Sequence, residues 1–146
     1  MSWGGATAAD VAIRRVDILH AEWNNSEINR GVLSCVGDKY EAGKTGYLRN
    51  WVIEDLVTET AVPLVFRISP HPFSPCPIHG LTLRDWNVRM NTEIGFKNYI
   101  TGNDPKEKFD GFVFDNVTIN GTRLTAANWM SAGNFEVANL ETPVFE

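Results

Sequence analysis

A short arrangement of apolar residues occurs five times along this chain and limits the folds that it can adopt. Apolar residues stand at positions i, i+2, i+5 and i+7, and a turn-type pair separates the two halves. The five stretches are VAIRRVDI from Val11, GYLRNWVI around Leu48, LTLRDWNV from Leu81, FVFDNVTI from Phe112 and FEVANLET from Phe135. Alternation with a period of two is typical of β-strands, so each stretch predicts two very short strands joined by a bend.

The bends predict how the strands follow one another. The second residue of each bend is Arg15, Asn50, Asp85, Asn116 or Asn139. Asn and Asp are the residues other than glycine that best tolerate a left-handed backbone conformation. A strand that turns on one left-handed residue, repeated along a chain, is typical of a coiled β-solenoid.

The spacing of the repeats fits this interpretation. If Val16, Trp51, Trp86, Val117 and Leu140 are equivalent, the steps are 35, 35, 31 and 23 residues, within the range that indicates repeat architectures. Strand candidates between the repeats would form a third side of each coil: GVLSCV at Gly31, PLVFRI at Pro63, TEIGF at Thr92 and RLTAANW at Arg123. Residues 97–108 contain Gly, Asn, Asp and Pro and are expected to form a surface loop. We expect an all-β chain of about four to five coils with little or no helix. An antiparallel sandwich of short strands is the alternative.

Composition restricts the classes of function. A chain of 146 residues is expected to form a single domain, 1–146, and its net charge of −5 with scattered basic residues argues against nucleic-acid binding. No apolar run reaches the roughly 18 residues of a membrane span, and the N-terminus lacks the features of a signal peptide. The chain as it stands is therefore expected in the cytoplasm, without a cofactor. Cys35 and Cys76 are either a disulfide pair or two free thiols.

Several stretches resemble one family of enzymes. They are SWGG followed by VAIRRVDILHAEW, then GVLSC, then LRNWVIEDLVTETAVPLVFRIS, and finally FDNVTINGTRLTAANW with NFEV. Together they resemble the last portion of glycoside hydrolase family 49, the dextranases and isopullulanases. The resemblance implies a single-stranded right-handed parallel β-helix with irregular loops, and its members are secreted.

The resemblance does not extend to the catalytic residues. The catalytic aspartates of that family, including an adjacent Asp-Asp pair, precede the segment that SWGG resembles. The resemblance therefore implies a fragment, or a freestanding descendant that lacks the inherited active site. The first and last coils of a solenoid expose backbone groups and core. We accordingly expect a homo-oligomer that forms through an exposed end.

Two carboxylates are candidates for acid–base chemistry. Glycoside hydrolysis uses two carboxyl groups, about 5 Å apart for retention and roughly 6.5–9.5 Å apart for inversion. Asp110 and Asp115 flank the strand at Phe112 and could share one surface. The structural alternative is that Asp115 belongs to a bend and Asp110 to a turn.

A metal site is a further candidate. His20-Ala-Glu22 matches the H-x-E pattern of zinc deaminases, and the segment from Pro75 to His79 is close to P-C-x-x-C. His20, Cys76 and His79 could hold zinc, with Glu22 moving protons. The proline-rich segment before His79 cannot open a helix, however, which argues against a deaminase.

Ligand-binding candidates complete the site prediction. Arg67 is a charge in the otherwise apolar stretch PLVFRIS, and it matches an arginine at the corresponding place in the resembled family. Four aromatic residues fall outside the core register or near loops and could stack on sugar rings: Trp23, Tyr40, Tyr47 and Trp129. The alternatives are an outward position in a half-buried strand for Arg67 and core edges or interfaces for the aromatic residues.

Three functions are consistent with these observations. The first is a non-catalytic module that binds a polysaccharide or oligosaccharide such as an α-glucan, or that acts as a scaffold. The second is a self-associating structural protein built on an open-ended solenoid. The third is a glycoside hydrolase with a carboxylate site of its own.

Overall fold

The computed structural model describes residues 7–21, 31–36, 47–69, 77–102, 104–106 and 108–146, and these residues form two β-sheets. The first sheet contains β1 (Thr7–Ala9), β2 (Ala12–Ile18), β4 (Tyr47–Thr58), β6 (Ile78–Val88), β8 (Asp110–Ile119), β9 (Thr122–Arg123) and β11 (Val144–Phe145). The second contains β3 (Leu33–Val36), β5 (Phe66–Ser69), β7 (Asn98–Thr101) and β10 (Phe135–Ala138). A 3₁₀ turn, Thr92–Ile94, and a short helix, α1 (Trp129–Ala132), are the helical elements of the described chain. The prediction of a β fold with little helix is confirmed.

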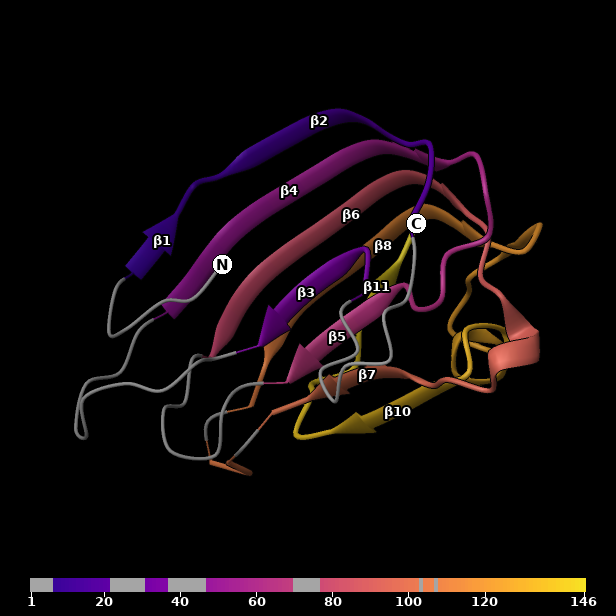
Figure 1. The fold of residues 1–146 in the computed structure, drawn as a ribbon. Helices are drawn as coiled ribbons and strands as arrows, with labels where there is room; N and C mark the ends of the chain where they lie inside the picture. The colour runs from indigo at the N-terminus through magenta and orange to yellow at the C-terminus, as the bar shows by residue number, and fades with distance from the viewer. Residues whose placement is uncertain (1–6, 22–30, 37–46, 70–76, 103, 107) are drawn as a thin grey trace.

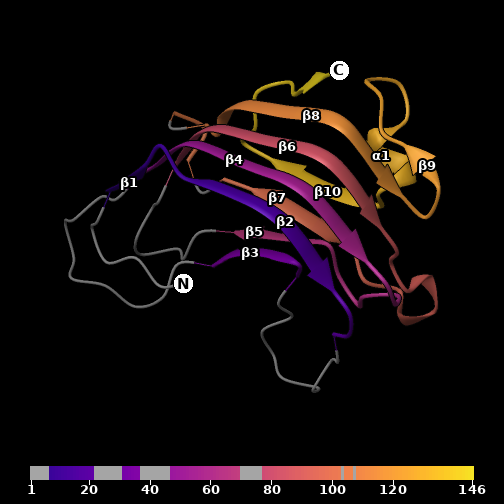
Figure 2. The same ribbon diagram turned by 90° about the horizontal axis from the view of Figure 1, so that it is seen from above.

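Strand pairing in both sheets is parallel, except for the short β8–β9 hairpin. From β4 onward the chain alternates between the sheets through β5, β6, β7, β8, β10 and β11, apart from the short strand β9, which follows β8 in the same sheet. Figures 1 and 2 show the long, arched strands of the first sheet lying over the short strands of the second. The antiparallel sandwich that the strand spacing also allowed is therefore wrong.

The long strands bend on left-handed residues, as the sequence predicts. Arg15, Asn50, Asp85, Asn116 and Asn139 all have φ between 52° and 56°. In β8 the burial alternates up to Phe114, then Asp115 and Asn116 both face outward before Val117 returns to the core. One left-handed residue thus shifts the alternation by one position, which explains the i, i+2, i+5, i+7 pattern.

The predicted equivalence of the repeats is wrong at Trp51 and at Leu140, which forms a bridge with Phe109. Val16 is in register with Leu56, which is in register with Trp86, and Trp51 is aligned with Leu81 instead. The left-handed residues form two sets five positions apart: Asp10, Asn50, Gly80 and Gly111 in one, and Arg15, Asp55, Asp85 and Asn116 in the other. The bend at Asn50 therefore belongs with Gly80, and Asp55 is the residue opposite Arg15. β4 bends at both Asn50 and Asp55, and the sequence pattern aligned Asn50 with Arg15 where the structure aligns Asp55.

Three other strand predictions differ from the structure. The fifth repeat does not join the first sheet, because β10 pairs with β7 in the second. The TEIGF stretch forms the 3₁₀ turn, where Asn91 accepts a hydrogen bond from the Glu93 amide and Gly95 ends the turn with a φ of 72°. RLTAANW passes from the β9 hairpin into α1. Residues 97–108 were expected to be a loop and contain β7. In TEIGF the cap at Asn91 and the left-handed Gly95 stabilise the 3₁₀ turn, so the alternating pattern does not form a strand there.

The core lies between the two sheets. Trp86 of β6 and Phe66 of β5 stack with ring centroids 5.7 Å apart and planes 3° from parallel, so this contact joins one sheet to the other. Both side chains are almost completely buried. Phe114 and Phe135 extend the same aromatic cluster toward α1.

A buried asparagine fixes a turn of the chain inside this core. Asn98 has no exposed surface, and its Oδ1 accepts hydrogen bonds from the amides of Val65 at 3.0 Å and Phe66 at 2.8 Å. Its Nδ2 donates to the Gly133 carbonyl oxygen. One side chain at the start of β7 thus ties the start of β5 to the segment before β10.

Two stacked glycines give a prediction for stability. Gly80 and Gly111 have φ of 83° and 64°, and a Cβ on Gly111 would lie 3.0 Å from the Gly80 backbone. Gly111→Ala should therefore lose roughly 1–2 kcal/mol for the left-handed backbone and roughly 1–3 kcal/mol more for the close contact. Gly121→Ala is the matched control, since Gly121 has a φ of 77° and open space around it. Urea denaturation would contradict this account if both variants lost the same stability.

Candidate functional site

A row of ionisable side chains crosses the first sheet at one end of its long strands. Arg49 of β4 is in register with His79 of β6, and His79 is in register with Asp110 of β8. Phe109 forms a parallel bridge with Leu140, which places Glu141 next to Asp110 in the same row. Neighbouring strands are about 4.8 Å apart, so these side chains lie within reach of one another.

The row borders a pocket of about 480 Å³. The described residues that line it are Tyr47, Pro77, His79, Pro105, Lys106, Lys108, Asp110 and Glu141. The long strands supply one wall, and the segment that leads into β8 supplies the lysines. Small-molecule sites usually measure about 300–1,000 Å³, so the size suits a small ligand or one unit of a longer one.

His79 and Asp110 form the best-defined contact in the pocket. Nδ1 of His79 lies 2.8 Å from Oδ2 of Asp110. An ionised carboxylate can only accept a hydrogen bond, so beside a charged Asp110 the proton lies on Nδ1, and Nε2 is the ring nitrogen that this contact does not use. The ring of Tyr47 is tilted by 32° against the His79 ring, with centroids 5.9 Å apart. Both members of the His79–Asp110 pair are partly exposed, so a ligand can reach them.

The structure thus brings together three residues that separate sequence arguments had selected. Tyr47 was a stacking candidate, His79 a metal ligand and Asp110 an acid or base. Lys106, Lys108 and Glu141 were missed. A signal for Glu141 was present, because His79, Asp110 and Glu141 follow one another at intervals of 31 residues, the same as the step from Trp86 to Val117.

Asp115 lies elsewhere and has a structural role. Its carboxylate accepts a hydrogen bond from Arg84 Nε at 2.6 Å, and Arg84 also contacts Glu54, which pairs with Arg14. The hydrogen bond and the charge of Asp115 raise the pKa of the Arg84 guanidinium. Asp115 is five residues beyond Asp110, roughly 16 Å along an extended strand. The two carboxylates do not flank a common bond.

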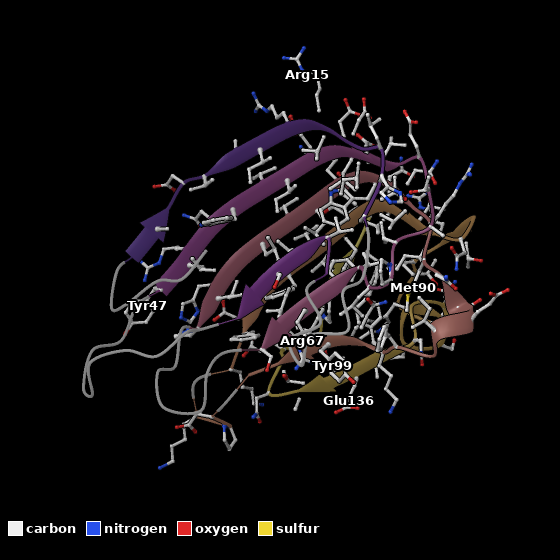
Figure 3. The ribbon with its side chains drawn as sticks, viewed as in Figure 1. Arg15, Tyr47, Arg67, Met90, Tyr99 and Glu136 are labelled. Atoms are coloured by element: carbon white, nitrogen blue, oxygen red, sulfur yellow. The ribbon has the colours of Figure 1, made fainter. Side chains whose placement is uncertain are left out.

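Arg67 belongs to the outer face of the second sheet. It is in register with Ser34 on one side and Tyr99 on the other, and Glu136 follows in the same row. Figure 3 shows Arg67, Tyr99 and Glu136 together on this face, away from Tyr47. The Arg67 guanidinium lies over the Tyr99 ring at 4.4 Å, and its Nε is buried without a hydrogen-bond partner among the residues that the structure describes. The arginine therefore packs on a ring of its own sheet.

The remaining candidates that the structure describes, Trp129 and His20, do not join this pocket. Trp129 packs on the rings of Phe114, Phe135 and Phe145, the arrangement of a residue that covers a core edge. His20 follows the end of β2, whereas His79 lies at the start of β6, at the opposite end of the sheet. No group of His, Cys, Asp and Glu side chains suited to a metal occurs among the described residues. Trp23, Tyr40 and Cys76, like Glu22, lie outside the residues that the structure describes, as does the side chain of Cys35.

Comparison of the chain with family models, with curated proteins and with solved structures finds no match. No relative therefore supplies a role for the pocket, and its own residues are the ground for any functional conclusion. Within the described part of the chain, no helix has the length and hydropathy to cross a membrane.

Proposed function

We propose that this chain is a short right-handed parallel β-helix of about four to five coils that binds a carbohydrate in the pocket beside His79 and Asp110. Two features support the solenoid: the regular alternation of the chain between two parallel sheets, and the alignment of left-handed bends across neighbouring strands. The resemblance of the sequence to dextranases and isopullulanases is consistent with this architecture and with an α-glucan ligand.

The composition of the pocket carries the proposal for its ligand. One aromatic ring, that of Tyr47, accompanies a histidine, two carboxylates and two ammonium groups. Such a lining offers donors and acceptors in several directions and one apolar face. Sugars present hydroxyl groups around a ring with apolar C–H faces, so they match this mixture better than an apolar ligand does.

The charges favour a neutral ligand over an anion. Lys106 and Lys108 contribute two positive charges and Asp110 and Glu141 two negative ones, so the described lining is neutral when His79 is neutral. Binding sites for phosphate or sulfate usually carry an excess of positive charge. A neutral glucan oligosaccharide does not require an excess of positive charge in its binding site.

Calorimetric titration of the chain with isomalto- and malto-oligosaccharides tests the proposal. Tyr47→Ala should weaken binding roughly threefold to tenfold through the lost stacking surface. Asp110→Asn should weaken it about tenfold, because a charge-assisted hydrogen bond to a hydroxyl group is lost. Glu136→Gln, on the outer face of the second sheet, is the control and should bind like the wild type. Absence of binding across the panel, or pocket variants with unchanged affinity, would refute a carbohydrate site.

Hydrolysis of a glycosidic bond is a second candidate, supported by the position of Glu141. Asp110 and Glu141 lie in the same row on adjacent segments of the chain, and strand spacing of about 4.8 Å is close to the roughly 5 Å between the carboxyl groups of retaining enzymes. Release of reducing sugar by the purified chain, abolished in both Asp110→Asn and Glu141→Gln, would support this reaction. Binding without any release would restrict the pocket to recognition.

A further inference from the structure

Strand β2 lies at the edge of the first sheet. Among the described strands its partner is β4, and Figures 1 and 2 show it as the outermost of the long strands. Its inward-facing side chains Ile13, Val16 and Ile18 are only partly buried, whereas the residues in register with them are buried: Ile53, Leu56 and Thr58. The apolar inner side of the sheet is thus incompletely covered at this edge.

The backbone N–H and C=O groups of β2 point alternately toward β4 and toward the open side of the strand. The carbonyl oxygens of Val11 and Ile18 accept hydrogen bonds from β4, from Val52 and Glu59. Successive residues of a strand direct their N–H and C=O groups to opposite sides. Ala12 and Arg14, and after the bend Asp17 and Leu19, therefore direct these groups away from β4.

We propose that two copies of this chain associate through β2, which pairs in antiparallel orientation with β2 of the second copy about a twofold axis. In this pairing Arg14 lies opposite Asp17 of the other copy, and Ala12 lies opposite Leu19. The proposal concerns a surface separate from the carbohydrate pocket and does not depend on it.

Three properties of β2 favour this register. The paired residues are those whose backbone groups point to the open side, so each pair can exchange two hydrogen bonds. Arg14 and Asp17 have opposite charges, and a twofold axis uses this pair twice. Leu19, which is 62 % exposed, would be covered by the partner, and Ile13 would lie beside Ile18 on the inner side.

Other registers are poorer. A shift of two residues places Arg14 opposite Arg15 in one direction and opposite Leu19 in the other, so the charge pairs are lost. Charged side chains on an edge strand normally prevent pairing with another sheet. Figure 3 shows Arg15 extending from β2 away from the molecule, where it does not obstruct the edge. On β2 the charges permit one register and oppose its neighbours, which is how an edge can be selective.

Sedimentation equilibrium of charge variants tests the pairing. The wild type should form a dimer of twice 16.3 kDa in a concentration-dependent way. Asp17→Arg and Arg14→Asp should each weaken the dimer about tenfold, since each places like charges opposite one another at two symmetric positions. The double variant restores both pairs and should return to within about threefold of the wild type.

A matched control removes the influence of the ion pair within one copy. Arg14 contacts Glu54, so Glu54→Gln breaks that contact without changing the edge and should leave the dimer intact. A 16.3 kDa species at every concentration, unchanged dimers in the single variants, or no recovery in the double variant would overturn the proposal.

Hydrogen exchange gives an independent measurement that needs no substitution. The amides of Ala12, Arg14, Asp17 and Leu19 should become protected as the protein concentration rises. The amides of Val52 and Glu59, already bonded to β2, should show little change. Equal exchange at low and high concentration would exclude pairing through this edge.

Discussion

Replacing Trp86 with alanine is expected to lower the free energy of unfolding by about 3–5 kcal/mol. The side chain is 1 % exposed, stacks on Phe66 of the facing sheet and donates a hydrogen bond from Nε1 to the Ile53 carbonyl oxygen at 2.8 Å. Its removal leaves a cavity between the sheets and takes one hydrogen bond from the Ile53 carbonyl oxygen. Chemical denaturation followed by circular dichroism measures the loss.

Trp86→Phe separates the two contributions of this residue. The ring that packs on Phe66 is largely retained, whereas the N–H donor is lost, so the expected loss is about 1–2 kcal/mol. If the alanine variant lost less than the phenylalanine variant, contact between the sheets through Trp86 would not be a main source of stability.

The second large effect is expected at Asn98. In Asn98→Ala the amides of Val65 and Phe66 and the carbonyl of Gly133 lose their partner. Each unsatisfied buried group costs about 1–3 kcal/mol, so a loss of at least about 3 kcal/mol is expected, or at least about 2 kcal/mol if a water molecule replaces one bond.

Asn91→Ala is the comparison for this prediction. Asn91 also accepts an amide hydrogen bond, from Glu93, but at an exposed position where water can replace it. Its substitution should cost about 1 kcal/mol or less. Similar losses for the two variants would mean that the buried bonds of Asn98 contribute no more than an exposed cap.

The strands and bends were largely predictable because they depend on local chemistry. Alternation of apolar residues identified β2, β4, β6 and β8, and the tolerance of Asn and Asp for a left-handed backbone supported one bend in each of β4, β6 and β8. Alignment between strands was less predictable. A strand with two left-handed residues five positions apart, such as Asn50 and Asp55, offers two registers, and the contacts that choose between them are far apart in the sequence.

β7 escaped prediction for a different reason. The Gly, Asn, Asp and Pro residues of 97–108 indicated a surface loop, and the buried position of Asn98 is not apparent until its hydrogen-bond partners are known. These partners lie more than thirty residues away on either side. Sequence reasoning applied along the chain does not identify a buried polar residue that is satisfied by distant backbone groups.

Three residues of the candidate pocket were selected from the sequence, but not as one assembly. Tyr47, His79 and Asp110 were selected for unrelated chemistry, and the constant interval of 31 residues from His79 to Glu141 had not been connected with them. In parallel sheets built by successive turns of a chain, a constant interval is what places side chains in one row. Candidate residues in such a chain are best compared at the spacing of the repeat.

The pairing of the strands also bears on how fast the chain can fold. Leu56 and Trp86, and then Trp86 and Val117, meet across intervals of 30 and 31 residues, so nearly every strand contact requires a long loop to close first. Chains dominated by such distant contacts fold in milliseconds to seconds, far more slowly than helical bundles of similar size. The aromatic contacts between β5, β6 and β8 join three successive passes of the chain, which makes them the expected nucleus, and the edge strand β2 is expected to join after the barrier has been crossed.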